Sequence, residues 1–235
     1  MRLALVCSWL NQYGGAERVL EVLHRMLPDA PVYTSVYHPA ALPDSFRSWD
    51  IRPTFVDHLP LSRRYPQAYL PLYPLAFESL SMREYDVVLS VTSAFAHGVV
   101  TPAHAHHLCY CLTPARFLWN YDAYIEREGI GRASRAALPL VVRGLRSWDR
   151  LAADRVGQFI AISRTVQRRI RDAYQRDAVI IYPPVRMPPS PPHVTPEDYY
   201  LIVSRLIPYK RIDLAVEAFN RNGLPLYIIG SGRDR

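Results

Sequence analysis

Lysine is nearly absent from this chain of 235 residues, whose lysines and arginines total 28. Lys210 is the single lysine of the sequence, and every other residue with a permanent positive charge is an arginine. The net charge of +7 at pH 7 favours anionic partners, which could be a phosphorylated small molecule, an acidic membrane surface or nucleic acid. Composition does not choose among these partners, but the isolated lysine marks one position where the chemistry of the side chain matters.

Cysteines and long apolar runs are scarce as well. Cys7, Cys109 and Cys111 are odd in number and form no C-x-x-C pair, so neither a disulfide framework nor a zinc site is indicated. A reducing cytoplasm is the expected compartment. No stretch reaches the roughly 18 apolar residues that a membrane-spanning helix needs, and the apolar start RLALVCSWL lacks a cleavage site, so it is interpreted as a first strand.

Several catalytic motifs are missing. The sequence has no G-x-S-x-G and no Walker loop, which excludes serine hydrolases of that type and ordinary nucleoside triphosphatases. It also has no D-x-D pair. His104, His106 and His107 lie close together but lack carboxylates at ligand spacing, so we expect no metal site.

Residues 1–185 combine short apolar runs with longer amphipathic segments. The first amphipathic segment, AERVLEVLHRML, has Val19, Leu20, Leu23 and Leu27 at helical spacing,. Nearly continuous apolar strands separated by helices indicate a parallel sheet that is covered on both faces. We therefore predict a doubly wound α/β, Rossmann-like domain with strands at 3–9, 86–93, 106–112, 158–163 and 178–185.

Proline density changes the character of the chain near residue 185, and the stretch 186–198 predicts a linker,. A strand at 199–203, a helix at 210–220 and a strand at 225–230 are expected to follow it. One βαβ unit is too small to bury both faces of a parallel sheet. Residues 199–235 are thus expected to begin a second Rossmann-like domain that is truncated in this chain.

Two segments are candidates for binding an anion. GGAER, with Gly14, Gly15 and Glu17, follows the first strand and opens the first helix, where free backbone N–H groups favour a phosphate. A tight turn that binds nothing explains the same residues equally well.

The second candidate is in the βαβ unit. Arg205 ends its first strand, Lys210 opens its helix, and Gly230 and Gly232 follow its second strand. All four are expected at the carboxyl edge of the sheet, where they would form a cradle for a diphosphate. The alternative is that the lysine lies by chance on a solvated face, although the helix dipole opposes a cation at a helix start.

The helix expected at 133–152 is basic and amphipathic. Its apolar face is predicted to contain Leu138, Val141, Leu145, Trp148 and Ala152, with Arg143, Arg146 and Arg150 opposite,. Such a helix could lie on an anionic membrane, but packing of the apolar face onto the sheet is the favoured interpretation. We expect no nucleic-acid partner, because the region has no recognition motif and its aromatic residues are not interleaved as stacking platforms.

Taken together, these segments resemble family 4 retaining glycosyltransferases of the two-Rossmann (GT-B) type. The resemblance is carried by GGAERV, YCLTPARFLW, IAIS, YPPV, SRLIPYKRIDLAVEAF and IIGSG, in that order along the chain. It implies transfer of a hexosyl group from a nucleoside-diphosphate sugar without a metal ion or other cofactor. By resemblance, Arg205, Lys210, Gly230 and Gly232 bind the donor diphosphate, and Gly14, Gly15 and Glu17 line the cleft between the domains.

The segment YCLTP most resembles a subgroup that uses GDP-mannose, so a mannosyltransferase is implied. The expected partners are the nucleotide-sugar donor and a lipid-linked or glycan acceptor of polysaccharide biosynthesis, with peripheral contact to the inner face of the membrane. Two departures from the family pattern stand out. Leu112 occupies the place where many relatives carry a histidine beside the reacting sugar, and the later pair of glutamates that positions the donor is missing.

The catalytic residues are therefore unknown at this stage. Either the subgroup works without the histidine, or His97 substitutes for it, or activity is impaired. We expect the 235-residue chain alone to turn over little or no donor. The alternative is a non-catalytic Rossmann-like binding or interaction module.

Overall fold

The computed structural model describes residues 1–120, 132–185, 187 and 195–232. The chain forms two compact units, which are described separately. Unit 1 contains Met1–Trp119 and Arg135–Val185, and unit 2 contains Asn120–Ser134 and Arg186–Arg235. Most of the linker predicted at 186–198 lies outside the described residues.

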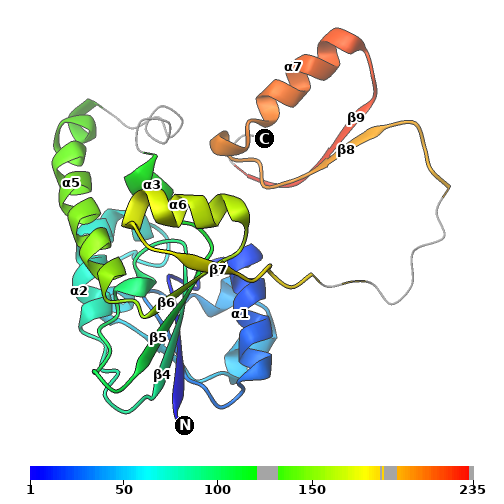
Figure 1. The fold of residues 1–235 in the computed structure, drawn as a ribbon. Helices are drawn as coiled ribbons and strands as arrows, with labels where there is room; N and C mark the ends of the chain where they lie inside the picture. The colour runs from blue at the N-terminus through cyan, green and yellow to red at the C-terminus, as the bar shows by residue number, and fades with distance from the viewer. Residues whose placement is uncertain (121–131, 186, 188–194, 233–235) are drawn as a thin grey trace. The chain divides into compact units, whose positions relative to one another are not determined.

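Unit 1 is built on a seven-stranded parallel sheet with the order β3-β2-β1-β4-β5-β6-β7 (Figure 1), which confirms the predicted Rossmann-like α/β fold. From β1 the chain moves outward to β3 and then returns to place β4 on the other side of β1. The order of strands therefore reverses between β1 and β4. The strands are β1 (Leu3–Cys7), β2 (Val32–Thr34), β3 (Ile51–Pro53), β4 (Val87–Thr92), β5 (His106–Cys111), β6 (Gln158–Ala161) and β7 (Ala178–Ile180).

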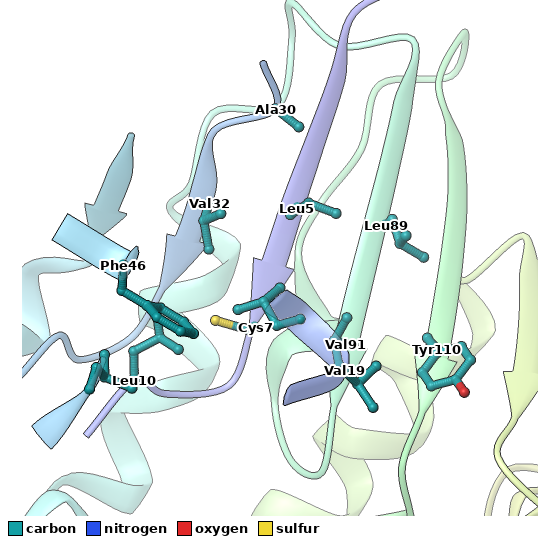
Figure 2. Packing of buried hydrophobic residues seen from close by; sticks show 12 residues of the cluster. Leu5, Cys7, Leu10, Val19, Ala30, Val32, Phe46, Leu89, Val91 and Tyr110 are labelled. Atoms are coloured by element: carbon teal, nitrogen blue, oxygen red, sulfur yellow. The ribbon is translucent and has the colours of Figure 1, made fainter. Parts of the chain in front are cut away.

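One face of this sheet is covered by α1 (Gly15–Met26), whose predicted apolar positions Val19 and Leu20 are buried. Alternate residues of a strand point to opposite faces, and Leu5 and Cys7 of β1 belong to the same cluster as Val19. Figure 2 shows this packing, which also includes Tyr110 of β5. Cys7 is thus a small apolar core residue.

The opposite face is covered by α2 (Tyr73–Glu78), α5 (Arg132–Asp154) and α6 (Arg164–Tyr174). Cys109 and Phe159, from β5 and β6, pack there against buried residues of α5 and α6. Helices on both faces make the sheet doubly wound, as predicted. Short 3-10 segments and one short helix complete unit 1: η1 (Pro39–Ala41), η2 (Asp44–Ser48), η3 (Phe55–His58), η4 (Pro66–Leu72), η5 (Ala96–Gly98) and α3 (Arg116–Trp119).

Helix α5 differs from its prediction in which side chains face inward. Val142 is buried and Val141 is only partly buried, while Leu145 and Ala152 are buried as predicted. The side chain of Leu138 lies outside those described. Arg146 Nε donates to Leu118 O at 3.0 Å and Arg150 Nε donates to Ala173 O at 3.1 Å.

Both guanidinium groups also lie over the ring of Trp119, at 5.6 and 5.0 Å from its centroid. Two of the three arginines expected to face solvent or a membrane therefore hold neighbouring elements in place. This arrangement favours the interpretation of α5 as a helix packed on the sheet. No helix within the described residues has the length and apolarity required to cross a membrane.

Unit 2 contains β8 (Tyr200–Val203), η6 (Pro208–Lys210), α7 (Ile212–Asn222) and β9 (Leu226–Ile229). β8 and β9 pair in parallel, which gives the expected βαβ unit. The helix begins two residues later than predicted, because Arg211 adopts a left-handed conformation with φ of 53° and ends the 3-10 turn. Lys210 therefore lies in that turn and not in the helix.

Candidate functional site

A pocket lies at the carboxyl edge of the unit 1 sheet, where the strand order reverses. In doubly wound folds this switch point is the usual position of a ligand. The pocket is lined by residues that follow β1, by the first turns of α1 and by the ends of β4 and β5. These residues are Cys7, Ser8, Trp9, Leu10, Ala16, Glu17, Leu20, Val91, Ser93 and Leu112.

Ser8 joins the two strands on either side of the switch point. Its hydroxyl donates to Ala94 O at 2.7 Å and accepts from Ser93 N at 3.3 Å. Its carbonyl accepts a hydrogen bond from the hydroxyl of Ser35, next to β2. These bonds hold the ends of β1, β2 and β4 together, so one side of the pocket rests on a fixed backbone.

Glu17 caps its own helix and also lines the pocket. Its Oε2 accepts a hydrogen bond from Gly14 N at 2.8 Å, and the side chain is only 3% exposed. A carboxylate in the first turn also interacts favourably with the helix dipole. A Cβ on Gly14 would lie 3.3 Å from Glu17 Oε2, whereas a Cβ on Gly15 would meet nothing within 4 Å, so a larger residue at position 14 would press on the carboxylate that forms the cap.

The chemistry of this pocket suits a neutral ligand that carries hydroxyl groups. Glu17 supplies a hydrogen-bond acceptor, Ser8 and Ser93 supply polar groups, and the other lining residues are mostly apolar. Among the described residues that line the pocket there is no lysine or arginine. The acidic side chain disfavours the phosphate that the GGAER motif suggested.

The structure places Leu112 in the pocket wall, so this position lacks a hydrogen-bonding side chain. His97, considered above as its substitute, is not among the lining residues and is only 1% exposed. Its Nε2 faces Asp149 of α5 at 3.3 Å. His97 therefore packs against α5, on the face of the sheet opposite to α1. The hypothesis that His97 replaces a histidine in the pocket is wrong.

In unit 2, Arg205 and Lys210 both follow β8, at its carboxyl end, and both are exposed. Gly230 and Gly232 follow β9 at the same edge, because the strands are parallel. The hydrogen bonds from Ser204 N to Ile229 O at 3.0 Å and from Leu206 N to Ser231 O at 2.9 Å continue the pairing beyond the strands. The structure thus brings the four predicted residues of the anion cradle to one edge of unit 2.

The two glycines have a role in packing that requires no ligand. A Cβ on Gly230 would lie 1.8 Å from Ser204 O, and a Cβ on Gly232 would lie 1.9 Å from Leu206 O. The two segments can approach this closely only because these positions lack a side chain. Their role in binding a diphosphate remains a prediction.

The described residues contain no group of three or more histidine, cysteine or acidic side chains that could hold a metal ion. Within the histidine cluster, His104 and His106 are exposed, while His107 is buried with its Nε2 2.9 Å from Ser90 Oγ. The cluster is therefore divided between the surface and the core.

Sequence reasoning missed Ser8, Trp9 and Ser93 as pocket residues. Ser8 and Trp9 follow β1, and Ser93 follows β4, the two strands that flank the switch point. The prediction of β1 and β4 would have pointed to them, had the order of the strands been known.

No protein-family model matches this chain, and no curated protein matches it either.

Proposed function

We propose that this chain carries the acceptor-side unit and the beginning of the donor-side unit of a retaining glycosyltransferase with GT-B architecture. It would transfer a hexosyl group, mannose from GDP-mannose being the favoured donor, to a lipid-linked or polysaccharide acceptor. The reaction would take place in the cytoplasm or at the inner face of the membrane. The proposal rests on two sites of different chemistry, one in each unit.

The observation that carries the proposal is the edge of unit 2. Arg205 and Lys210 lie beyond the carboxyl end of β8, and Gly230 and Gly232 follow the adjacent strand. Two cations can neutralise a diphosphate and the charge that develops on it as the glycosidic bond breaks. Lysine provides a compact charge on a flexible stem, whereas arginine provides a planar fork, so one of each can bind different oxygens of the same group.

The pocket of unit 1 supplies the acceptor side in this proposal. Glu17 offers a carboxylate to acceptor hydroxyl groups, and Trp9 offers an aromatic surface. Leu112 provides no group that could take part in proton transfer, so we assign no catalytic residue.

The open face of the unit 2 sheet also supports a larger donor-side domain. α7 covers the side that contains Tyr200, whose ring lies 4.9 Å from that of Phe219 in α7. On the other side, Val203, Tyr227 and Ile229 are 71%, 59% and 58% exposed. Parallel sheets are normally covered on both faces, so this face favours packing against further helices.

Calorimetric titration of the chain with GDP and GDP-mannose tests the donor site. We expect Arg205→Ala and Lys210→Ala each to weaken GDP binding by roughly tenfold or more, since a charge-assisted hydrogen bond contributes about 1.5–3 kcal/mol. Arg221→Ala, which removes an exposed arginine of α7 in the same unit, should change the affinity by less than about twofold. Equal affinities in all variants would remove the basis of the donor site.

Sugar transfer is a separate measurement. We expect the 235-residue chain to transfer little or no mannose to a glycan acceptor, because Leu112 provides the pocket with no group for proton transfer. Clear turnover that depends on Lys210 would support the enzyme class and contradict the expected inactivity of this chain.

The second candidate, a non-catalytic glycan-binding module, is favoured by one observation, the apolar Leu112 in the pocket wall. Binding of a neutral mannose oligosaccharide that is lost in Glu17→Gln, together with no GDP binding, would favour the module. GDP binding that depends on Arg205 and Lys210 would favour the transferase.

A further inference from the structure

Helix α6 carries an unusual concentration of positive charge. Arg164, Arg168, Arg169 and Arg171 fall within its 11 residues. Arg171 is paired with Asp177 at 2.8 Å. Arg164 and Arg168 are exposed, and neither forms an ion pair with a described residue.

These arginines lie at the same sheet edge as the unit 1 pocket. Ser163, two residues beyond the end of β6, caps the helix by accepting a hydrogen bond from Val166 N at 3.2 Å. α6 therefore begins at this edge of the sheet, with Arg164 as its first residue. Arg169 Nη1 donates to Thr113 Oγ1 at 3.4 Å, which ties the helix to the residue that follows Leu112 of the pocket wall.

The pocket and the arginines of α6 follow strands that are neighbours in the sheet. β6 is the immediate neighbour of β5, and neighbouring strands lie about 4.8 Å apart. Arg116, at the start of α3, is a further exposed arginine that follows the end of β5. These arginines thus follow the carboxyl ends of the same sheet as the pocket, although α6 packs on the face opposite to α1 and none of the arginines is among the lining residues.

Only part of this charge is offset within the helix, by Asp172, which lies four residues after Arg168,. Arg164 and Arg168 are separated by one helical turn, where like charges repel each other. Arg164 is also in the first turn, which contains no acidic residue and where the helix dipole opposes a cation. A bound anion would offset both effects.

We propose that Arg164, Arg168 and Arg169 form an anion subsite that binds a phosphate or diphosphate group of the acceptor. The subsite and the pocket divide the ligand by charge. The pocket, with Glu17 in its wall, takes the neutral hydroxyl-bearing part, and α6 takes the anionic part. The identification of the ligand as the acceptor rests on the proposed function, whereas the anion subsite itself does not.

The test is calorimetric titration with inorganic pyrophosphate at low ionic strength. The parent chain carries Arg205→Ser and Lys210→Ser, so that the donor site of unit 2 does not contribute. The test variant adds Arg164→Ser, Arg168→Ser and Arg169→Ser. The matched control instead adds Arg25→Ser, Arg83→Ser and Arg171→Ser, three exposed arginines whose removal changes the net charge equally.

We expect the test variant to lose at least about tenfold in affinity for pyrophosphate, and the control to lose less than about twofold. A second arm measures sedimentation with phosphatidylcholine vesicles that contain phosphatidic acid. A loss in the vesicle arm alone assigns the anion to a lipid headgroup, and a loss in the pyrophosphate arm assigns it to a soluble phosphate group.

Three results would overturn the subsite: no binding by the parent in either arm, no loss in the test variant, or equal losses in the test and control variants. Because Arg205 and Lys210 are replaced throughout, none of these results bears on GDP binding by the unmodified chain. Failure of the subsite is therefore distinguishable from failure of the proposed function.

Discussion

The imidazole Nε2 of His97 lies 3.3 Å from Oδ1 of Asp149, and the two side chains are 1% and 0% exposed. The second carboxylate oxygen of Asp149 accepts hydrogen bonds from Trp119 Nε1 at 2.7 Å and from Tyr174 OH at 2.9 Å. One buried carboxylate therefore connects η5, α3, α5 and α6. The network thus holds together the helices on this face of the unit 1 sheet.

Replacement of Asp149 by alanine should strongly destabilise unit 1. The change leaves the donor groups of Trp119 and Tyr174 without their acceptor in the core and removes the charge that faces His97. Removal of one partner of a buried charged pair typically costs about 3–5 kcal/mol. Urea denaturation followed by tryptophan fluorescence measures the loss. Asp149→Asn, which keeps the shape and one acceptor oxygen, should lose less than Asp149→Ala. A loss of under about 1 kcal/mol in the alanine variant would contradict a supporting role.

The same pair predicts how stability changes with pH. Burial lowers the pKa of His97, but the charge and hydrogen bonds of Asp149 outweigh it, with Cys109 adding to them, and the net pKa is raised above its ordinary value of 6.5. The folded state therefore holds the proton more tightly than the unfolded state. The resulting stabilisation is complete below about pH 6.5 and is lost as pH rises through the pKa of the folded state.

Comparison of the free energy of unfolding of the native chain and His97→Gln between pH 6 and pH 9 tests this prediction. The difference between the two proteins should shrink as pH rises. The groups that face His97 are Asp149, Tyr174, Cys109 and His107, so none of them should be altered in the comparison. A difference that grows with pH would mean that His97 is neutral in the fold.

His107 should produce a dependence of the opposite sign. Its burial, with added repulsion from His97 and Arg155, lowers its pKa to about 3, so the folded state resists the proton that the unfolded state accepts near pH 6.5. Stability should fall as pH decreases from about 6.5 toward 3, by up to about 1.4 kcal/mol per pH unit for this one group. In His107→Gln, the free energy of unfolding should fall less steeply as the pH is lowered. If this dependence on pH is the same in both proteins, other groups determine the loss of stability in acid.

Much of the fold follows from the sequence because its central strands are long apolar runs. β1, β4, β5 and β6 lie within the predicted strands, and α1 within one residue of its predicted start and end. β2 and β3 were missed because each has three residues and lies between proline-containing turns. Such short strands form because they pair with neighbouring strands, and they are too short to show an alternating pattern of apolar residues in the sequence.

The site was less predictable than the fold. Glu17 was predicted at a cleft, and its hydrogen bond to Gly14 N shows that it also serves its own helix. Arg146 and Arg150 were expected to face outward, but each donates to a carbonyl group of a neighbouring helix, α3 or α6, and sequence spacing does not reveal these contacts. The arginines of α6 drew no attention in the sequence, because their importance depends on the position of β6 beside β5.

Gly230 should be essential for the close pairing of the segments that follow β8 and β9. A Cβ at this position would lie 1.8 Å from Ser204 O, so Gly230→Ala must separate the two segments. We expect hydrogen exchange of the Ser204 and Leu206 amides, which donate to Ile229 O and Ser231 O, to accelerate at least about tenfold.

The control for this prediction is Gly223→Ala. Gly223 has φ of 70° but no atom within 4 Å of a Cβ, so alanine there costs about 1–2 kcal/mol of backbone strain without pushing the two segments apart. The Ser204 and Leu206 amides should keep their protection relative to the rest of unit 2. If both variants accelerate exchange equally, the close approach is not what holds this edge.

The open face of the β8–β9 sheet should bind a hydrophobic dye. Val203 and Ile229 are direct partners in the register and are 71% and 58% exposed, and Leu201 and Tyr227 lie on the same face at 50% and 59%. Four neighbouring apolar side chains form a contiguous patch, which isolated surface leucines do not. The native chain should therefore increase the fluorescence of anilinonaphthalene sulfonate without any denaturant.

Val203→Ser with Ile229→Ser should reduce this fluorescence by roughly half, since both members of the central pair become polar. The matched control is Leu140→Ser with Leu151→Ser, which removes two leucines of α5 that are 78% and 62% exposed but lie about three helical turns apart. The control should leave the signal almost unchanged. If both double variants reduce it equally, the dye reports general surface apolarity, and the argument that unit 2 requires additional covering helices would lose its support.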